Sequence, residues 1–209
     1  MVERLRERKK RETRQAIADV ATGLFARDGF DAVTVADVAR AAGVAKMTVF
    51  NYFARKEDLL FDRYDDLIGL VVEAISTRPT GQSAVAAVRD LYLTLTRERH
   101  PLGSFLPTAP AFWDIVAASS ALRARRREFS DELQKALAEL LASERGAPAG
   151  DPTARTMAGA IVVVINTVTD EAIRRMSAGE SPDAAEAAQL ALINAQFALI
   201  EPAESANDR

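Results

Sequence analysis

The chain has 209 residues, 48% hydrophobic and 27% charged, which is typical of a globular protein with one or two domains and a substantial core. It has no cysteine, which excludes disulfides, thiolate metal sites and a cysteine nucleophile. Its single histidine, His100, argues against a histidine metal cluster and removes the most common general base, so we expect no enzyme, metal or cofactor.

The net charge of −3 conceals an asymmetry along the chain. Residues 1–56 carry 12 Lys and Arg against 7 Asp and Glu, a net charge of +5, whereas residues 57–209 carry 15 against 23, a net charge of −8. The basic end is suited to a polyanion such as DNA. The most apolar run, residues 157–165, is too short to span a membrane. No apolar stretch follows the charged N-terminus, so we expect no secretory signal. We therefore expect a cytoplasmic protein.

The pattern of apolar residues predicts an all-α protein of about nine helices, because almost no segment alternates with a period of two. The expected helices cover residues 6–28, 34–41, 45–53, 56–77, 82–99, 111–117, 120–144, 151–179 and 181–200. The last two have clear starts, since Asp151 and Ser181 are good N-caps and each precedes a proline.

The first helix carries an apolar stripe with helical spacing, formed by Ile17, Val20, Ala21, Leu24 and Phe25. Gly29 is the expected C-cap of this helix. Thr34 followed by Asp37 resembles a capping box and predicts the start of the second helix.

Residues 34–60 contain the most informative pattern. Two short helices are joined by a tight turn, Ala42-Gly43-Val44, and Gly43 accepts a positive φ at no steric cost. This is the arrangement of a helix-turn-helix, which inserts its second helix into the major groove of DNA. Val49 and Phe53, together with Phe50, are expected to pack inward or near the backbone.

The outward side of the third helix then carries the groups that can contact DNA. Lys46 can donate to guanine, Asn51 can pair with adenine, and Met47 and the Thr48 methyl group can touch a thymine methyl group. The hydroxyl groups of Thr48 and Tyr52 can equally bind phosphate. Thr34 and Lys56 lie at expected helix N-termini, where phosphates bind. A solvated helix face remains the alternative for each polar residue.

Residues 11–60 resemble the DNA-binding domain of the tetracycline-repressor (TetR) family of bacterial regulators. The resemblance rests on the apolar stripe and on the ordered set Gly29-Phe30, Thr34-Val35, Val38-Ala39, Ala42-Gly43-Val44, Thr48-Val49-Phe50, Tyr52-Phe53 and Lys56-Glu57-Asp58-Leu59. It implies an N-terminal three-helix DNA-binding domain, residues 1–55, followed by a helical ligand-binding and dimerisation domain, residues 56–209. The implied DNA contacts are Thr34, Ala45, Lys46, Met47, Thr48, Asn51, Tyr52 and Lys56.

Two positions depart from the family pattern. The family often has tyrosine where this chain has Phe50, so a phosphate contact through that hydroxyl is not expected here. The position of Tyr52 is often histidine, and the tyrosine hydroxyl is a substitute donor. The basic segment 4–11 precedes these helices. It could lie along a phosphate backbone or reach a minor groove, or it could equally be a solvated helix start with i,i+4 ion pairs.

The resemblance also implies a homodimer through the last two helices. Small or apolar residues support a close helix contact: Ala154, Ala158, Gly159, Val162 and Ile165 in the eighth helix, and Ala184, Ala188, Ala191, Leu192, Ala195 and Leu199 in the ninth. Packing within one chain would use the same residues. A dimer explains specific binding, since two half-sites about one turn apart match a two-fold axis and predict a palindromic operator in double-stranded DNA.

Candidate ligand residues are the aromatics of the middle helices and two polar residues of the eighth: Tyr92, Phe105, Phe112, Trp113, Phe129, Asn166 and Asp170. Most such aromatics are simply core. Asn166 and Asp170 need polar partners, for which an interhelical bond is favoured over a ligand. The proline-broken segment 101–110 could form a pocket entrance, whereas Arg123, Arg125, Arg126 and Arg127 are expected to be solvated.

The function expected from these features is a DNA-binding repressor released from its operator by a small hydrophobic or amphipathic effector. The alternative is a DNA-binding architectural or partner-regulated protein without a small-molecule ligand. Neither the effector, the operator sequence nor the direction of regulation follows from the sequence.

Overall fold

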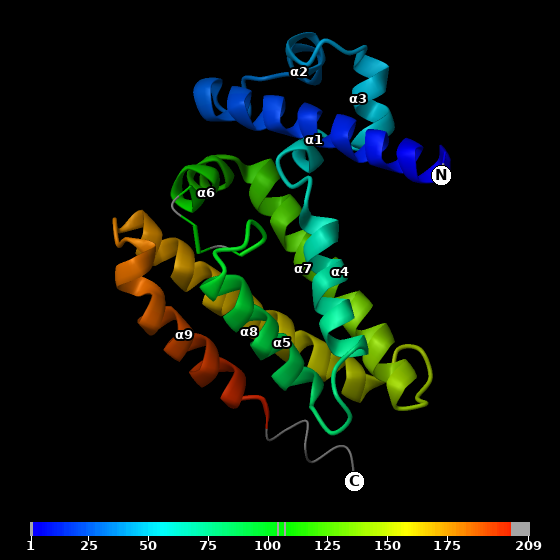
Figure 1. Ribbon diagram of the computed structural model, residues 1–209, viewed down its shortest axis with the longest axis vertical. Coiled ribbons are helices and arrows are strands. Elements are labelled where there is room, and N and C mark those ends of the chain that lie inside the picture. The colour runs from blue at the N-terminus through cyan, green and yellow to red at the C-terminus, as the bar shows by residue number, and fades with distance from the viewer. Residues whose placement is uncertain (1, 104, 107, 202–209) are drawn as a thin grey trace. The chain divides into compact units, whose positions relative to one another are not determined.

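The computed structural model describes residues 2–103, 105–106 and 108–201, with side chains from Arg6 onward except that of Glu7. Within this part of the chain the secondary structure is entirely helical, as predicted. Its nine α-helices and one 3-10 turn (Figure 1) are α1 (Val2–Asp28), α2 (Val35–Ala41), α3 (Lys46–Tyr52), η1 (Glu57–Leu59), α4 (Tyr64–Ser76), α5 (Ala84–Arg97), α6 (Ala109–Ala118), α7 (Ser120–Glu144), α8 (Pro152–Ser177) and α9 (Pro182–Ala198).

The predicted N-caps of α2, α8 and α9 are confirmed in atomic detail. The Thr34 hydroxyl accepts from the Asp37 backbone N–H at 3.2 Å, and the Asp37 carboxylate accepts from the Thr34 N–H at 3.0 Å, which completes a capping box on α2. The Asp151 carboxylate caps α8 through the N–H of Ala154, and the Ser181 hydroxyl caps α9 in the same way. Each cap satisfies a backbone donor that the first turn of a helix leaves without a partner.

The fourth helix begins later than predicted. In place of a helix from residue 56, the chain forms the short turn η1, and α4 starts only at Tyr64. Leu59, Leu60 and Phe61 are all buried. Three consecutive residues of an α-helix point in directions 100° apart, so they cannot all lie on one buried face. The irregular backbone here is what lets all three side chains enter the core.

The helices form two compact units, each with its own core. One comprises Met1–Tyr64 and Ala111–Arg126, and the other comprises Asp65–Pro110 and Arg127–Arg209. In the first unit the stripe of α1 is buried as predicted at Ile17, Ala21 and Phe25. The second unit is built around α8, α9 and α5, with α8 and α9 side by side in Figure 1.

Helix α8 supplies a large share of the core of the second unit. Ten of its residues are buried: Ala154, Met157, Ala158, Ile161, Val162, Val164, Ile165, Val168, Ala172 and Met176. This helix is also long and apolar enough to cross a membrane by length and composition alone, a test that core helices pass as well. Its buried side chains agree with a role as a core helix.

Candidate nucleic-acid interface

Helices α2 and α3 form the predicted helix-turn-helix. Gly43 has φ of +67°, and the backbone N–H of Val44 returns to the carbonyl of Ala39 at 3.0 Å. An L-residue with a side chain would be strained at this φ, so glycine makes the tight turn accessible. Val38 and Val49 are each at most 1% exposed, and they fix α2 and α3 in one core.

Helix α3 exposes a mixed polar and apolar surface. Lys46, Met47 and Asn51 are exposed, with Met47 at 68%, whereas Thr48 and Tyr52 are half-buried. The inward prediction is confirmed for Val49 and Phe53 but is wrong for Phe50, which is 41% exposed. Phe50 lies one turn after Lys46, whose ammonium stands 5.8 Å from the centre of the Phe50 ring.

Thr34 and Ala45 begin the two helices. The Thr34 hydroxyl lies 2.6 Å from the Asp37 carboxylate, so the hydroxyl is already engaged within the capping box. The same contacts lower the pKa of Asp37, through the Thr34 hydroxyl first and then the Thr34 N–H. Ala45 is the exposed N-cap residue of α3 and offers no side-chain cap.

Lys56 has a structural role that the sequence did not reveal. Its ammonium donates to the Phe30 carbonyl at 2.5 Å and lies 4.1 Å from the centre of the Phe30 ring. Burial lowers the pKa of Lys56, and the nearby Asp31 and Glu57 carboxylates oppose this shift. Lys56 therefore joins the loop after α1 to the start of η1, and its contact with phosphate stays a prediction.

Replacing Lys56 with alanine is expected to lower the stability of the protein by about 1 to 2 kcal/mol, because it removes a charged hydrogen bond and a cation–π contact from a half-buried site. Thermal unfolding followed by circular dichroism measures the change, with the exposed Lys10 replaced by alanine as control. An unchanged melting temperature, together with a salt dependence of DNA binding lowered by ~0.9 per lost phosphate contact, would instead make Lys56 a phosphate ligand only.

Two polar contacts join residues 111–126 to the N-terminal part of the first unit. The Arg125 guanidinium donates to the Asp58 carboxylate at 2.8 Å, and the Ser119 hydroxyl donates to Asp31 at 2.9 Å. The side chains of Arg125 and Asp58 are only 13% and 16% exposed, so the prediction that Arg125 is solvated is wrong. Arg126 is not free either, since its guanidinium lies 4.9 Å from the Trp113 ring. Sequence spacing could not reveal these pairs, because 67 and 88 residues separate the Arg125 and Ser119 contacts along the chain.

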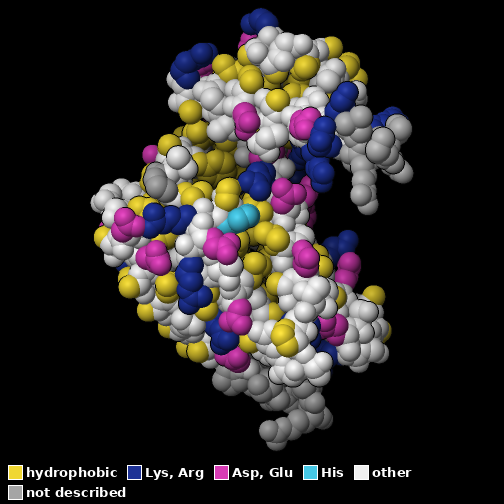
Figure 2. Space-filling model, viewed as in Figure 1, with side chains coloured by type: hydrophobic (Ala, Val, Ile, Leu, Met, Phe, Trp, Pro, Cys, Tyr) yellow, Lys and Arg dark blue, Asp and Glu magenta, His cyan; other side chains and the backbone are white. Residues whose placement is uncertain are grey.

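The basic segment 4–11 lies partly outside the described side chains. The side chains of residues 1–5 and 7 lie outside the described ones. Arg8 and Glu12 form an exposed i,i+4 ion pair at 3.3 Å, which agrees with the solvated-helix alternative for this segment. Figure 2 shows acidic and basic side chains interspersed over the face that it presents.

The seven candidate ligand residues do not belong to one unit. Phe112 and Trp113 are in the first unit, where the Phe112 ring centre lies 5.9 Å from that of Phe61 and 5.1 Å from that of Trp113. The other five are in the second unit: Tyr92, Phe105, Phe129, Asn166 and Asp170.

In the second unit most of the candidates are core or interhelical residues. Tyr92 packs against Phe197, with ring centres 6.3 Å apart, and Phe105 belongs to a small buried cluster with Ala172 and Met176. Asn166 and the Ser130 hydroxyl of α7 are 3.3 Å apart, which is the interhelical bond favoured by the sequence. Asp170 is exposed.

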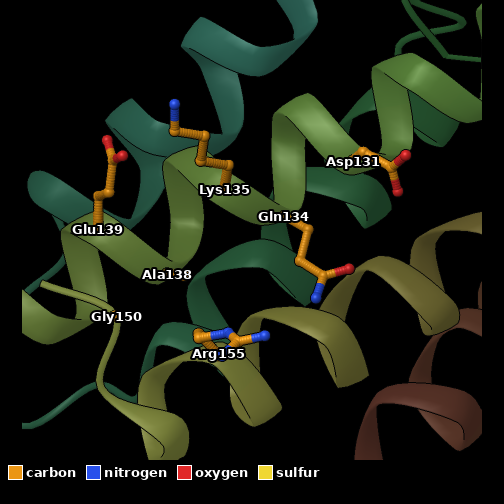
Figure 3. A pocket seen from close by; sticks show the side chains of 7 residues that line it. All are labelled: Asp131, Gln134, Lys135, Ala138, Glu139, Gly150 and Arg155. Atoms are coloured by element: carbon orange, nitrogen blue, oxygen red, sulfur yellow. The ribbon is translucent and has the colours of Figure 1, made fainter.

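A hollow of about 410 Å³ lies between α7 and the start of α8. It is lined by Asp131, Gln134, Lys135, Ala138, Glu139, Gly150 and Arg155, and none of the predicted ligand residues is among them. In Figure 3 Gln134 points from α7 toward α8. The proline-broken segment 101–110 does not line this hollow, and its residues 104 and 107 lie outside the described ones.

The dimer candidates of α8 and α9 divide into two groups. Ala154, Ala158, Val162 and Ile165 are buried inside the second unit, so these residues of α8 serve packing within the chain. On α9, in contrast, the alanines of the predicted set are exposed: Ala184, Ala188, Ala191 and Ala195. Val163 of α8 is 64% exposed and Leu199, at the end of α9, is 72% exposed.

Comparison with known proteins agrees with this architecture. Residues 17–62 match the bacterial regulatory proteins of the tetR family. The chain is similar to TcmR, an HTH-type transcriptional regulator of Streptomyces glaucescens, with 27% identity over 150 residues that cover 70% of this chain and 66% of TcmR. It is also similar to the regulator MftR of Mycobacterium tuberculosis, with 51% identity over 49 residues that cover 23% of this chain and 25% of MftR. Both matches thus span less than two thirds of the relative.

Among solved structures, the fold is similar to that of NalD, the secondary repressor of the MexAB-OprM multidrug efflux pump in Pseudomonas aeruginosa. The TM-score is 0.55 at 20% sequence identity, with 89% of this chain and 97% of NalD covered. The family match falls on α1 to η1, where the helix-turn-helix lies. By this match, residues 17–62 of the chain form a domain of the tetR family of bacterial regulatory proteins.

Proposed function

We propose that this protein is a homodimeric transcriptional repressor that binds a palindromic operator in double-stranded DNA and is released by a small hydrophobic or amphipathic ligand. The observation that carries the proposal is the surface of α3. A short helix, presented by a capped helix-turn-helix, exposes Lys46, Met47 and Asn51 together. These are the donor, apolar and amide groups that distinguish base pairs in the major groove.

Within this proposal the α3 residues divide by their chemistry. Lys46 donates to guanine O6 and N7, Asn51 pairs with adenine, and Met47 contacts a thymine methyl group. Thr34, Tyr52 and Lys56 contact phosphate, Thr48 contacts phosphate or a thymine methyl group, and Ala45 is a further DNA contact. Base contacts set the sequence preference, and phosphate contacts set the register on the duplex.

A second copy of the chain is the proposed partner of the exposed face of α8 and α9. Met47, Phe50, Val163 and Leu199 are the large hydrophobic side chains that are exposed in the described part of the chain. Two of them lie on α3 and the other two on α8 and at the end of α9. Exposed apolar groups beside a row of alanines suit close packing of helices from two subunits. A two-fold axis would then present two copies of α3 to successive major grooves.

The roles proposed for the two parts of the chain follow from the resemblance to the TetR family. Residues 1–55 are proposed to bind DNA, and residues 56–209 to bind the effector and form the dimer, in the cytoplasm where the operator is accessible. Of the candidate ligand residues, Tyr92, Phe105 and Phe129 are buried in the second unit. An effector site of this kind would be mostly apolar with a few polar groups, which suits a hydrophobic or amphipathic effector.

Selection of bound sequences from random double-stranded DNA tests the DNA-binding part of the proposal. We expect an enriched palindrome whose half-sites are centred about one helical turn, ~10 bp, or a multiple of it apart. An enriched single half-site would contradict the dimeric arrangement. If no sequence is enriched, and binding falls with salt equally for all DNA, the chain is a non-specific DNA-binding protein.

The effector is tested separately by thermal shift with hydrophobic and acyl compounds. A ligand that binds only the folded state at 100 times its Kd stabilises the protein by about 2.7 kcal/mol, which is a readily measured shift of the melting temperature. The same compound is expected to release the operator. Stabilisation without release, or no stabilisation by any compound, would favour the alternative of a DNA-binding protein controlled by a protein partner.

A further inference from the structure

Arg14 of α1 contacts the backbone at the end of α3, although 38 residues separate it from Tyr52. Its guanidinium donates to the Tyr52 carbonyl at 2.5 Å and to the Asp62 carbonyl at 3.0 Å. The same group lies 4.3 Å from the centre of the Phe53 ring. One half-buried side chain thus holds the end of α3 and the segment that precedes α4.

We infer that Arg14 is a positioning residue for sequence recognition, which sets the orientation of α3 without contacting DNA. The inference rests on the proposed DNA-binding function. Helix α3 has seven residues and no basic residue in its last turn, so it supplies no cation of its own to its negative end. Arg14 supplies that cation from α1.

The need for an external contact follows from the length of α3. Helices this short are marginal on their own and depend on tertiary contacts for their stability and direction. The inward side chains Val49 and Phe53 hold α3 through apolar packing, which is not directional. The Arg14 hydrogen bond to Tyr52 is directional, and it acts on the helix that carries Lys46 and Asn51. A small rotation of α3 would move both side chains off the edges of the bases.

Arginine fits this position because its guanidinium is a planar fork with donors in fixed directions. Two of these donors reach carbonyls of Tyr52 and Asp62, which belong to different segments of the chain. A lysine ammonium is a single compact charge on a flexible stem and cannot hold both carbonyls in the same geometry. The contact with Phe53, in which a flat cation lies close to a ring, has the same preference for arginine.

The test compares Arg14→Met, Arg14→Lys and Arg11→Met with the unmodified protein. Arg11 is exposed on the same helix, so its replacement removes an equal charge without touching α3. Affinity is measured for the selected operator and for a scrambled duplex over a range of salt concentrations. We expect Arg14→Met to lower the ratio of operator to scrambled affinity about 10-fold, as the loss of the charged hydrogen bond to the end of α3 implies. Arg14→Lys should give an intermediate loss, with the salt slope unchanged in both.

Hydrogen exchange supplies a readout that general destabilisation would not reproduce. Arg14→Met should speed exchange of the backbone amides at the end of α3, including the Phe53 N–H bonded to the Val49 carbonyl, while α2 keeps its protection. A salt slope lowered by ~0.9 per contact, with the affinity ratio intact, would mean that Arg14 binds phosphate. Unchanged affinity ratio and exchange, or equal loss of protection in α2 and α3, would overturn the positioning role.

If the unmodified protein shows no preference for any sequence, the proposed function itself fails. That outcome is distinct from a failure of the Arg14 inference, in which the unmodified protein is selective and its variants are equally so.

Discussion

Replacing both Val163 and Leu199 with glutamate is expected to convert the proposed dimer into a monomer and to abolish specific operator binding at nanomolar concentrations. Each side chain is more than 60% exposed in the single chain, and the proposed interface would cover both. Loss of each apolar contact costs about 1.5 to 3 kcal/mol, and burial of an unpaired carboxylate costs several more. Because a two-fold interface contains each substitution twice, the dimer dissociation constant should rise by at least ~10³-fold.

Sedimentation equilibrium measures the change in mass, and fluorescence anisotropy with a labelled operator measures the change in affinity. Thr94→Glu is the matched control, since Thr94 is exposed on α5 and outside the proposed interface. It should leave the dimer intact. A double variant that is still dimeric and still binds the operator would remove α8 and α9 from the interface. Circular dichroism shows whether the double variant still folds. If it unfolds, the same measurements are made on the single variant Val163→Glu.

Replacement of Lys46 and Asn51 should have the next largest effect, through the base contacts proposed for these residues. A good side-chain–base pair is worth about 1 to 3 kcal/mol, so two half-sites give about 2 to 6 kcal/mol per residue replaced. We expect Lys46→Met to relax the preference for guanine at one position of each half-site, and Asn51→Ala to relax a preference for adenine. Binding to scrambled DNA should change little in comparison.

Base analogues can assign each contact to an atom. Substituting 7-deaza-adenine removes the N7 acceptor alone, and it should weaken the unmodified protein but not Asn51→Ala. Substituting 7-deazaguanine should likewise weaken binding by the unmodified protein but not by Lys46→Met. The exposed Lys10, replaced by methionine, controls for loss of charge. Equal weakening on every sequence, with a lower salt slope, would reassign Lys46 to phosphate.

Much of the architecture was predictable because its causes are local. The capping box of Thr34 and Asp37, the proline starts of α8 and α9, and the turn at Gly43 each depend on residues within a few positions of one another. Local hydrogen bonds and backbone preferences decide these features, so a single sequence contains the information. The exposure of Lys46, Met47 and Asn51 followed from helical periodicity in the same way.

The tertiary structure alone decided which distant residues meet. Lys56 and Arg125, both basic residues predicted at accessible positions, turned out to have partners 26 and 67 residues away in the chain. Phe50 is exposed, whereas Leu59, Leu60 and Phe61 are buried in succession, because the shape of the core and not the apolar character of one residue sets burial.

The candidate ligand residues show the same limit. Aromatic side chains at helical spacing indicate a buried face, but they do not say against which helix that face packs, so Phe112 and Phe105 were grouped although they lie in different units. The contacts of Arg14 likewise join residues that are distant in the chain, so the sequence did not reveal them. The sequence by itself determined that a capped helix-turn-helix exists and that it exposes Lys46, Met47 and Asn51, since those features depend on neighbouring residues. Only the tertiary structure decided what holds that helix in place, because guanidinium and carbonyl meet across 38 residues of chain.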